Sequence, residues 1–181
     1  MVKSAYSFAT KKEKIESHII VVWVDNESGV LGRVVGLFSG RGYNIDSLAV
    51  AEVDKKKNIS RITISTSGTL QVLQQIKLQL GKLVPVHKVA DFPANKKTLL
   101  REMALIKIVS AKTQLEKAKK LCKKYKYIIL DRTQKSYVFE VSALKKEIDQ
   151  LIKKLQPLGL ASVSRTGVVA MPKGSEIFNQ N

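Results

Sequence analysis

Residues 18–38, HIIVVWVDNESGVLGRVVGLF, decide the fold class because a strand, a sharp turn and a helix follow one another there. The stretch 18–24 is almost entirely apolar and rich in β-branched residues, which is typical of a buried strand. Turn and capping residues follow, with Ser28 as the expected N-cap of a helix. Apolar side chains then recur at helical spacing at Val30, Val34 and Phe38.

The pattern continues outward through the rest of the first half. After the helix, the sequence predicts two strands around a charged hairpin, then a second helix and a fourth strand. The expected ranges are a strand at 43–53, a hairpin loop at 54–58, a strand at 59–66, a helix at 70–80 and a strand at 83–89. The first half therefore has the order βαββαβ.

A linker is expected at 93–98, after which the same order repeats. The expected ranges are a strand at 103–109, a helix at 115–125, strands at 127–130 and 137–141, a helix at 144–155 and strand-like sequence at 158–169. The prediction is an α+β fold of two ferredoxin-like βαββαβ domains in tandem. Each antiparallel sheet would carry its helices on one face, so another sheet or a second subunit is expected to cover the bare face.

The domain boundaries follow from these ranges. A flexible basic tail is expected at 1–14, the first domain at 15–92, the second domain at 99–174 and a short tail at 175–181. The chain has one cysteine, no apolar run long enough to cross a membrane and no secretory signal at its start. These features predict no membrane partner and a cytoplasmic location, in a bacterium or in a plastid stroma.

The net charge of +17 is concentrated in the second half. Residues 96–178 hold nineteen basic and seven acidic residues, a net of +12. A basic half suggests an anionic partner such as nucleic acid. However, 26 of the 32 basic residues are lysines, and most lie between apolar positions of expected helices, as on a solvated face. The lysine pattern therefore favours a solvated surface over nucleic-acid binding.

No set of residues suited to catalysis stands out. His18 and His87 lie in expected strands without a neighbouring nucleophile, and two histidines do not make a metal site. Cys122 lies on the apolar face of an expected helix, as core cysteines do. We expect no catalytic residues, no bound metal and no cofactor in this chain.

The informative motif is Asn26-Glu27-Ser28-Gly29-Val30-Leu31, between the first strand and the first helix. A helix N-terminus offers free N–H groups and a positive dipole end, which hold a carboxylate. A glycine lets a ligand approach the backbone, and an asparagine amide both donates and accepts. Together these groups suit a free amino acid, with Val30 and Leu31 as apolar surface. A loop and cap without a ligand is the alternative.

The motif, extended over 26–38 and followed by RGYNIDSL at 41–48, resembles the regulatory (small) subunit of acetohydroxyacid synthase, also called acetolactate synthase. Further stretches resemble that family at 60–64, 75–85, 101–107 and 164–171. The resemblance spans about 18–173, nearly the whole chain. It implies an N-terminal ACT domain, which binds small effectors, and a related C-terminal fold that helps to engage and activate the catalytic subunit.

The resemblance also implies partners and a site. The partner is the catalytic (large) subunit, a separate chain that carries thiamine diphosphate, a divalent metal and FAD. The chain would form a homodimer through its ACT domains, with valine as the usual feedback inhibitor at the interface. By resemblance, the effector-binding residues of one subunit are Asn26, Gly29, Val30 and Leu31, and those of the other subunit are Asn44 and Ile45. An amino-acid-responsive nucleic-acid-binding regulator is the alternative function.

Overall fold

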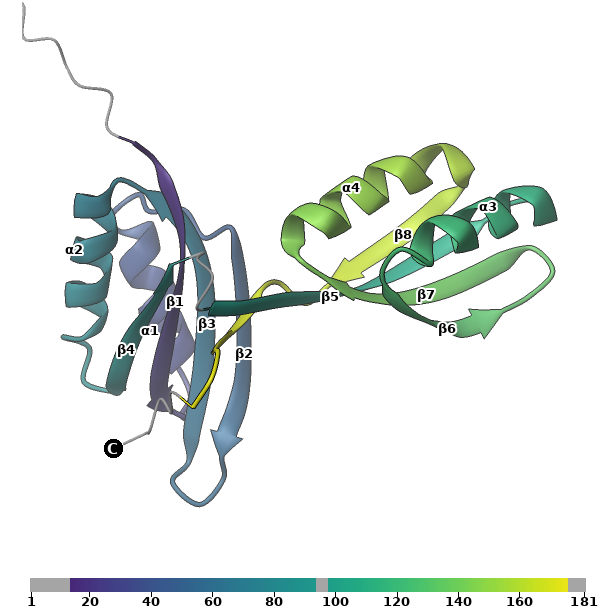
Figure 1. Ribbon diagram of the computed structural model, residues 1–181. Coiled ribbons are helices and arrows are strands. Elements are labelled where there is room, and N and C mark those ends of the chain that lie inside the picture. The colour runs from purple at the N-terminus through teal and green to yellow at the C-terminus, as the bar shows by residue number, and fades with distance from the viewer. Residues whose placement is uncertain (1–13, 94–97, 176–181) are drawn as a thin grey trace, which may run out of the picture.

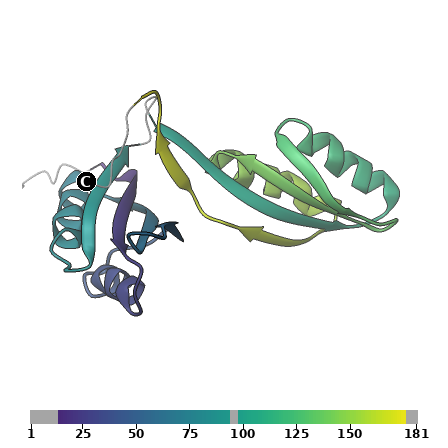
Figure 2. The same ribbon diagram turned by 90° about the horizontal axis from the view of Figure 1, so that it is seen from below.

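The computed structural model describes residues 14–93 and 98–175, which form two α/β units joined by a two-stranded ribbon (Figures 1 and 2). Its first unit is a four-stranded antiparallel sheet in the order β2-β3-β1-β4, with two helices on one face. The elements are β1 (Glu16–Asp25), α1 (Val30–Ser39), β2 (Ser47–Asp54), β3 (Ile59–Gly68), α2 (Leu70–Leu80) and β4 (Val86–Pro93).

β1 lies in the middle of this sheet and is buried on both faces. Its even-numbered residues from Ile20 to Val24 pack towards the helices, against Val34 and Phe38 of α1 among others. Its odd-numbered residues from Ile19 to Trp23 pack on the opposite face. A strand covered on both sides has no polar alternation, which explains why 18–24 forms an unbroken apolar run.

The second unit repeats the architecture with its own core. Its sheet has the order β6-β7-β5-β8, and α3 and α4 pack on one face. The elements are β5 (Thr98–Val109), α3 (Lys112–Cys122), β6 (Lys126–Arg132), β7 (Ser136–Ala143), α4 (Lys145–Leu155), a 3₁₀ turn (Gln156–Leu158), β8 (Leu160–Arg165) and β9 (Val169–Pro172). The predicted pair of ferredoxin-like α+β units in tandem is confirmed.

The two units are connected by an antiparallel ribbon that the sequence did not reveal. β5 is longer than expected, and its first residues, 98–101, pair with β9. The ribbon places Leu100, Val168 and Ala170 against Ile19, Val21 and Trp23 on the open face of the first sheet. The expectation was that another sheet or a second subunit covers this face, and over this part of it two strands of the second sheet, β5 and β9, do so.

A polar contact also holds the ribbon to the sheet. The Arg61 guanidinium on β3 donates a hydrogen bond to the backbone carbonyl of Ala170 on β9. The same guanidinium lies 5.4 Å from the centre of the Trp23 ring, within range of a cation–π interaction. The ribbon thus packs on the first unit through both apolar and charged groups.

Besides β5, three predicted strands differ in their bounds from the observed ones. The strand-like sequence at 158–169 is divided into β8 and β9 by a bend at Gly167, whose φ is 77°. β2 begins only at Ser47, because Gly42 has a φ of 67° and Tyr43 donates back to the carbonyl of Phe38. β4 starts at Val86 and extends to Pro93.

Parts of the predicted termini and linker lie outside the described residues. Residues 1–13, 94–97 and 176–181 are not described, so the expected tails and most of the expected linker receive no structural account. Within the described part of the chain, no helix has the length and apolar character needed to cross a membrane.

Candidate functional site

The loop between β1 and α1 presents an open helix N-terminus. Gly29 is the N-cap residue and has a φ of 84°, the left-handed region that favours glycine. No side chain caps the helix, and its first turn contains no acidic residue. The expected cap at Ser28 is therefore wrong. The Val30 N–H donates to the Glu27 carbonyl and the Arg33 N–H to the Gly29 carbonyl. Among the described residues this leaves the N–H groups of Leu31 and Gly32, with the positive dipole end of α1, to bind an anion.

Asn26 is held at the entrance of this loop by groups on and next to β3. The Ser60 hydroxyl donates to Asn26 Oδ1 at 3.0 Å. The Asn26 backbone N–H donates to the Asn58 carbonyl at 2.8 Å, and Asn58 Nδ2 donates to the Asn26 carbonyl at 3.3 Å. With Oδ1 occupied, Asn26 Nδ2 has no partner among the described residues and remains a free donor. Sequence reasoning did not find Asn58 or Ser60.

The two apolar residues at the start of α1 have different surroundings. Val30 is only 4% exposed and packs in the core of the first unit, so only its backbone reaches the loop. Leu31 is 41% exposed and follows Gly29 by two residues. Of the two, only Leu31 offers its side chain to a ligand in this structure.

Asn44 and Ile45 lie at the opposite end of the sheet. β1 and β2 both run antiparallel to β3, so the segment that precedes β2 lies far from the loop that follows β1. The separation is about the length of β2, roughly 25 Å at 3.3 Å per residue. The structure of one chain therefore does not bring Asn44 and Gly29 together.

The segment around Asn44 is fixed to the sheet by hydrogen bonds. Asn44 Nδ2 donates to Asp46 Oδ1 at 2.6 Å, and the Thr66 hydroxyl donates to the Asn44 carbonyl at 2.6 Å. The Asp46 N–H donates to the Ser65 carbonyl at 2.8 Å. Ile45 is half-buried against the core of the first unit.

β2, which follows this segment, is the edge strand of its sheet. Among the described residues it pairs only with β3, and it exposes Val50 and Val53. A long apolar edge of this kind is a template for pairing with another strand. The two halves of the predicted site thus lie at opposite ends of a sheet whose β2 edge is open to a second chain.

The histidines and the cysteine occupy structural positions. His18 Nδ1 lies 2.7 Å from Asp91 Oδ1, and His87 Nε2 lies 2.6 Å from Asp25 Oδ1. Cys122 is fully buried, and burial raises the pKa of its thiol to about 12. In the part of the chain that the structure describes, no three His, Cys, Asp or Glu side chains are grouped to hold a metal.

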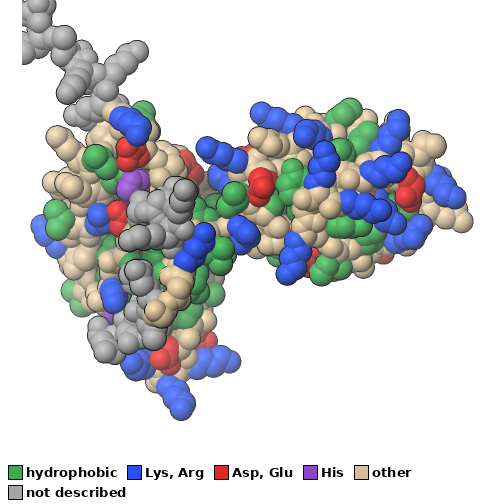
Figure 3. Space-filling model, viewed as in Figure 1, with side chains coloured by type: hydrophobic (Ala, Val, Ile, Leu, Met, Phe, Trp, Pro, Cys, Tyr) green, Lys and Arg blue, Asp and Glu red, His purple; other side chains and the backbone are tan. Residues whose placement is uncertain are grey.

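The basic residues of the second unit are spread over its surface. Figure 3 shows Lys and Arg side chains distributed over the visible face of this unit, without one continuous band. The carboxylates of α3 and α4 are engaged within the unit: Glu116 accepts from the Tyr137 hydroxyl, and Asp149 accepts from Arg165. This distribution fits the solvated helix faces expected from the lysine pattern.

The fold and the open loop define a class of protein. A four-stranded βαββαβ sheet with a ligand-accessible helix N-terminus after its first strand is the architecture of an ACT domain, a small ligand-sensing module. Residues 20–88 match the family model of the ACT domain found in small subunits of acetohydroxyacid synthase. Residues 101–174 match the family model of the acetolactate synthase small subunit.

Whole-chain comparisons identify the family. The acetolactate synthase small subunit of Haemophilus influenzae is 37% identical over 159 residues, which cover 87% of this chain and 96% of that protein. The acetolactate synthase isozyme 3 small subunit of Salmonella typhimurium is 38% identical over 161 residues, covering 88% of this chain and 98% of that one. The crystal structure of the small subunit from Thermotoga maritima superposes with a TM-score of 0.81 at 30% identity, covering 89% and 99% of the two chains. The chain belongs to the acetolactate synthase small-subunit family.

Proposed function

We propose that this chain is the regulatory subunit that activates the catalytic subunit of acetolactate synthase and makes it sensitive to feedback inhibition by valine. The observation that carries the proposal is the open N-terminus of α1 at Gly29, beside the free amide donor of Asn26. An amino-acid carboxylate would bind the helix N–H groups and the Asn26 amide. Thiamine diphosphate, a divalent metal and FAD would reside on the catalytic subunit, which condenses pyruvate in branched-chain amino-acid synthesis.

The site would be completed by a second copy of the chain. If two β2 edges pair antiparallel about a two-fold axis, each β2 starts where the other ends. Asn44 of the partner subunit, which precedes its β2, then lies at the end of the sheet that carries Gly29. The same pairing would cover Val50 and Val53, which are 43% and 46% exposed. The opposite placement of Asn44 and Gly29 within one chain thus supports a shared site.

The two units would have different functions. We assign effector binding to the domain at 15–92 and engagement of the catalytic subunit to the domain at 99–174, with the linker at 93–98 between them. To inhibit, valine must bind the less active state of the complex more tightly than the active one. The coupling free energy expected for such regulation is about 1–3 kcal/mol, which corresponds to several-fold up to about hundred-fold effects.

Acetolactate formation tests this function. The catalytic subunit from the same organism is assayed alone, with this chain, and with this chain plus valine. Stimulation that valine reverses is the expected result. Stimulation without valine sensitivity would refute valine as the effector, and absence of stimulation by a folded, bound chain would refute the regulatory role.

A further inference from the structure

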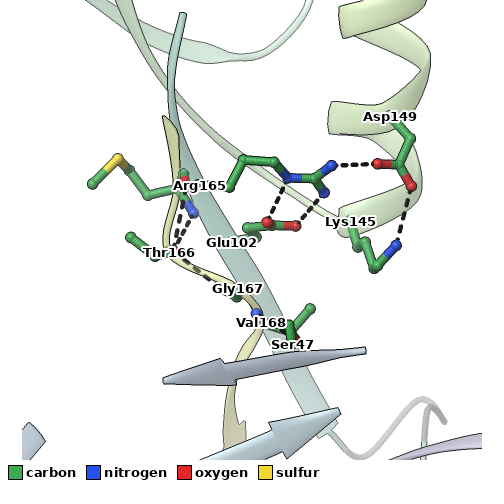
Figure 4. Close-up of polar contacts among 9 residues, drawn as sticks. Ser47, Glu102, Lys145, Asp149, Arg165, Thr166, Gly167 and Val168 are labelled. Atoms are coloured by element: carbon green, nitrogen blue, oxygen red, sulfur yellow. Dashed lines mark hydrogen bonds and ion pairs between the residues drawn. The ribbon is translucent and has the colours of Figure 1, made fainter. Parts of the chain in front are cut away.

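One short segment of the second unit touches the effector half next to the proposed site. The bend at 166–168, which joins β8 to β9, lies against Ser47, the first residue of β2 (Figure 4). The Val168 N–H donates to Ser47 Oγ at 3.4 Å. Gly167 is buried here, and a Cβ added to it would lie 3.1 Å from Ser47 Cβ and 3.3 Å from Ser47 Oγ. A Cβ at position 167 would therefore require Ser47 to shift by a few tenths of an ångström.

On the effector side, Ser47 is fixed to the proposed binding segment. It follows Asn44 by three residues and pairs with Ser65 on β3. The hydrogen bonds of Thr66 to the Asn44 carbonyl and of Asp46 to the Ser65 carbonyl hold the intervening backbone against the sheet. A ligand that displaces or immobilises Asn44 therefore acts on Ser47 through a stretch of three residues that these hydrogen bonds hold to β3.

On the other side, the bend is fixed to the second unit. The Thr166 N–H donates to the Met103 carbonyl at 3.1 Å, and the Met103 N–H donates to the Thr166 hydroxyl at 3.2 Å. The preceding residue, Arg165, donates two hydrogen bonds of 2.7 Å to the buried carboxylate of Glu102 and one of 2.6 Å to Asp149 on α4 (Figure 4). Movement of the bend is thereby transmitted to β5 and α4.

We propose that Ser47 and Gly167 form the joint through which occupation of the effector site acts on the second unit. This inference rests on the proposed function. The apolar packing of the ribbon on β1 and β3 holds the two units together, whereas this joint is where the connecting bend meets the effector segment. Ser47 and Gly167 are positioning residues: they do not contact the effector, and they transmit its binding.

The test separates valine binding from valine inhibition. Ser47→Ala removes the acceptor of the Val168 hydrogen bond, and Gly167→Ala adds a Cβ at a φ of 77° against Ser47. Gly174→Ala is the matched control, because Gly174 has a φ of 76° and no atom within 4 Å of an added Cβ. For each full-length variant, valine affinity is measured by calorimetry on the small subunit, and residual activity at saturating valine is measured on the reconstituted complex.

At the joint, both variants are expected to bind valine within about twofold of the wild-type affinity, while the residual activity at saturating valine rises about fivefold or more. Gly174→Ala is expected to match the wild type in both assays. Wild-type inhibition in Ser47→Ala would overturn the inference, and so would a parallel loss of binding and inhibition. If Gly167→Ala fails to fold, the binding and inhibition measurements on Ser47→Ala are sufficient to test the inference. Absence of inhibition in the wild type would instead refute the proposed function.

Discussion

Substitution of Gly29 by aspartate is the sharpest perturbation of the proposed site. The φ of 84° places this residue in the left-handed region, where a side chain costs about 1–2 kcal/mol. Aspartate tolerates that region better than most residues, so about 1 kcal/mol is expected. An added Cβ meets no atom within 4 Å, so no steric clash adds to this cost. A domain with an unfolding free energy of about 5–15 kcal/mol remains folded.

The effect on valine is larger than the effect on folding. The new carboxylate would occupy the N-terminus of α1, where the valine carboxylate is expected, and would repel it. Loss of a hydrogen bond to a charged group costs about 1.5–3 kcal/mol, so valine affinity should fall about 10- to 100-fold. Gly29→Ala is the matched control: it has the same backbone strain without the charge, so its loss of affinity should be smaller.

The assay is acetolactate formation by the reconstituted complex across a valine titration, with circular dichroism as the check on folding. The expected order of valine sensitivity is wild type, then Gly29→Ala, then Gly29→Asp, with stimulation of the catalytic subunit retained in all three. Full valine inhibition of the Gly29→Asp complex at wild-type valine concentrations would refute the placement of the carboxylate at this helix N-terminus.

Three further predictions concern the second unit. Glu102 is 3% exposed and accepts two hydrogen bonds from Arg165, whose side chain is 28% exposed. Glu102→Gln should therefore lower the unfolding free energy by about 1–3 kcal/mol. An unchanged denaturation midpoint would contradict this prediction. Gly159 has a φ of 92°, and in Gly159→Ala the added Cβ would lie 2.4 Å from the Val109 carbonyl oxygen. Chemical denaturation should therefore show that the unfolding free energy falls by at least about 2 kcal/mol. An unchanged unfolding free energy would show that the backbone at Gly159 shifts without cost. Because burial raises the pKa of Cys122 to about 12, a thiol reagent at pH 8 should label the unfolded chain and spare the folded one; rapid labelling of the folded chain would place the thiol outside the core.

The elements of the first unit could be predicted because their patterns are local. The unbroken apolar run at 18–24 and the helical spacing of Val30, Val34 and Phe38 correspond to the observed β1 and α1. The sequence analysis placed the N-cap of α1 at Ser28, because a serine side chain can accept a hydrogen bond from the first turn of a helix. In the structure the N-cap residue is Gly29. The left-handed φ of that glycine decides the start of the helix.

The ribbon could not be predicted, because it depends on contacts between distant parts of the chain. The apolar pattern of 158–169 is the same whether it forms one strand or two. At the division, Gly167 packs against Ser47, 120 positions earlier in the sequence, and no local pattern contains such a contact. The covering of the first sheet by Val168 and Ala170 follows from the same bend.

The sequence predicts the residues of the candidate site but not their arrangement in space. The residues of the loop at 26–31 are exposed, with the exception of Val30, whose side chain is buried in the core. The placement of Asn44 at the other end of the sheet follows from the direction of β2, and the sequence pattern alone does not reveal it. The orientation of Asn26 by Ser60 depends on strand pairing in the same way.

The most direct test of the shared site is valine binding by a mixed dimer. A Gly29→Asp chain and an Asn44→Ala chain with different affinity tags are co-expressed, and the heterodimer is isolated through both tags. In a shared site, one pocket of this heterodimer combines the intact Gly29 of one chain with the intact Asn44 of the other. Calorimetry should then find one valine per heterodimer at near wild-type affinity. At the same valine concentrations the wild type should bind two, and either variant homodimer should bind with an affinity at least about tenfold lower. A heterodimer that binds no valine while the doubly tagged wild type binds two would contradict the account.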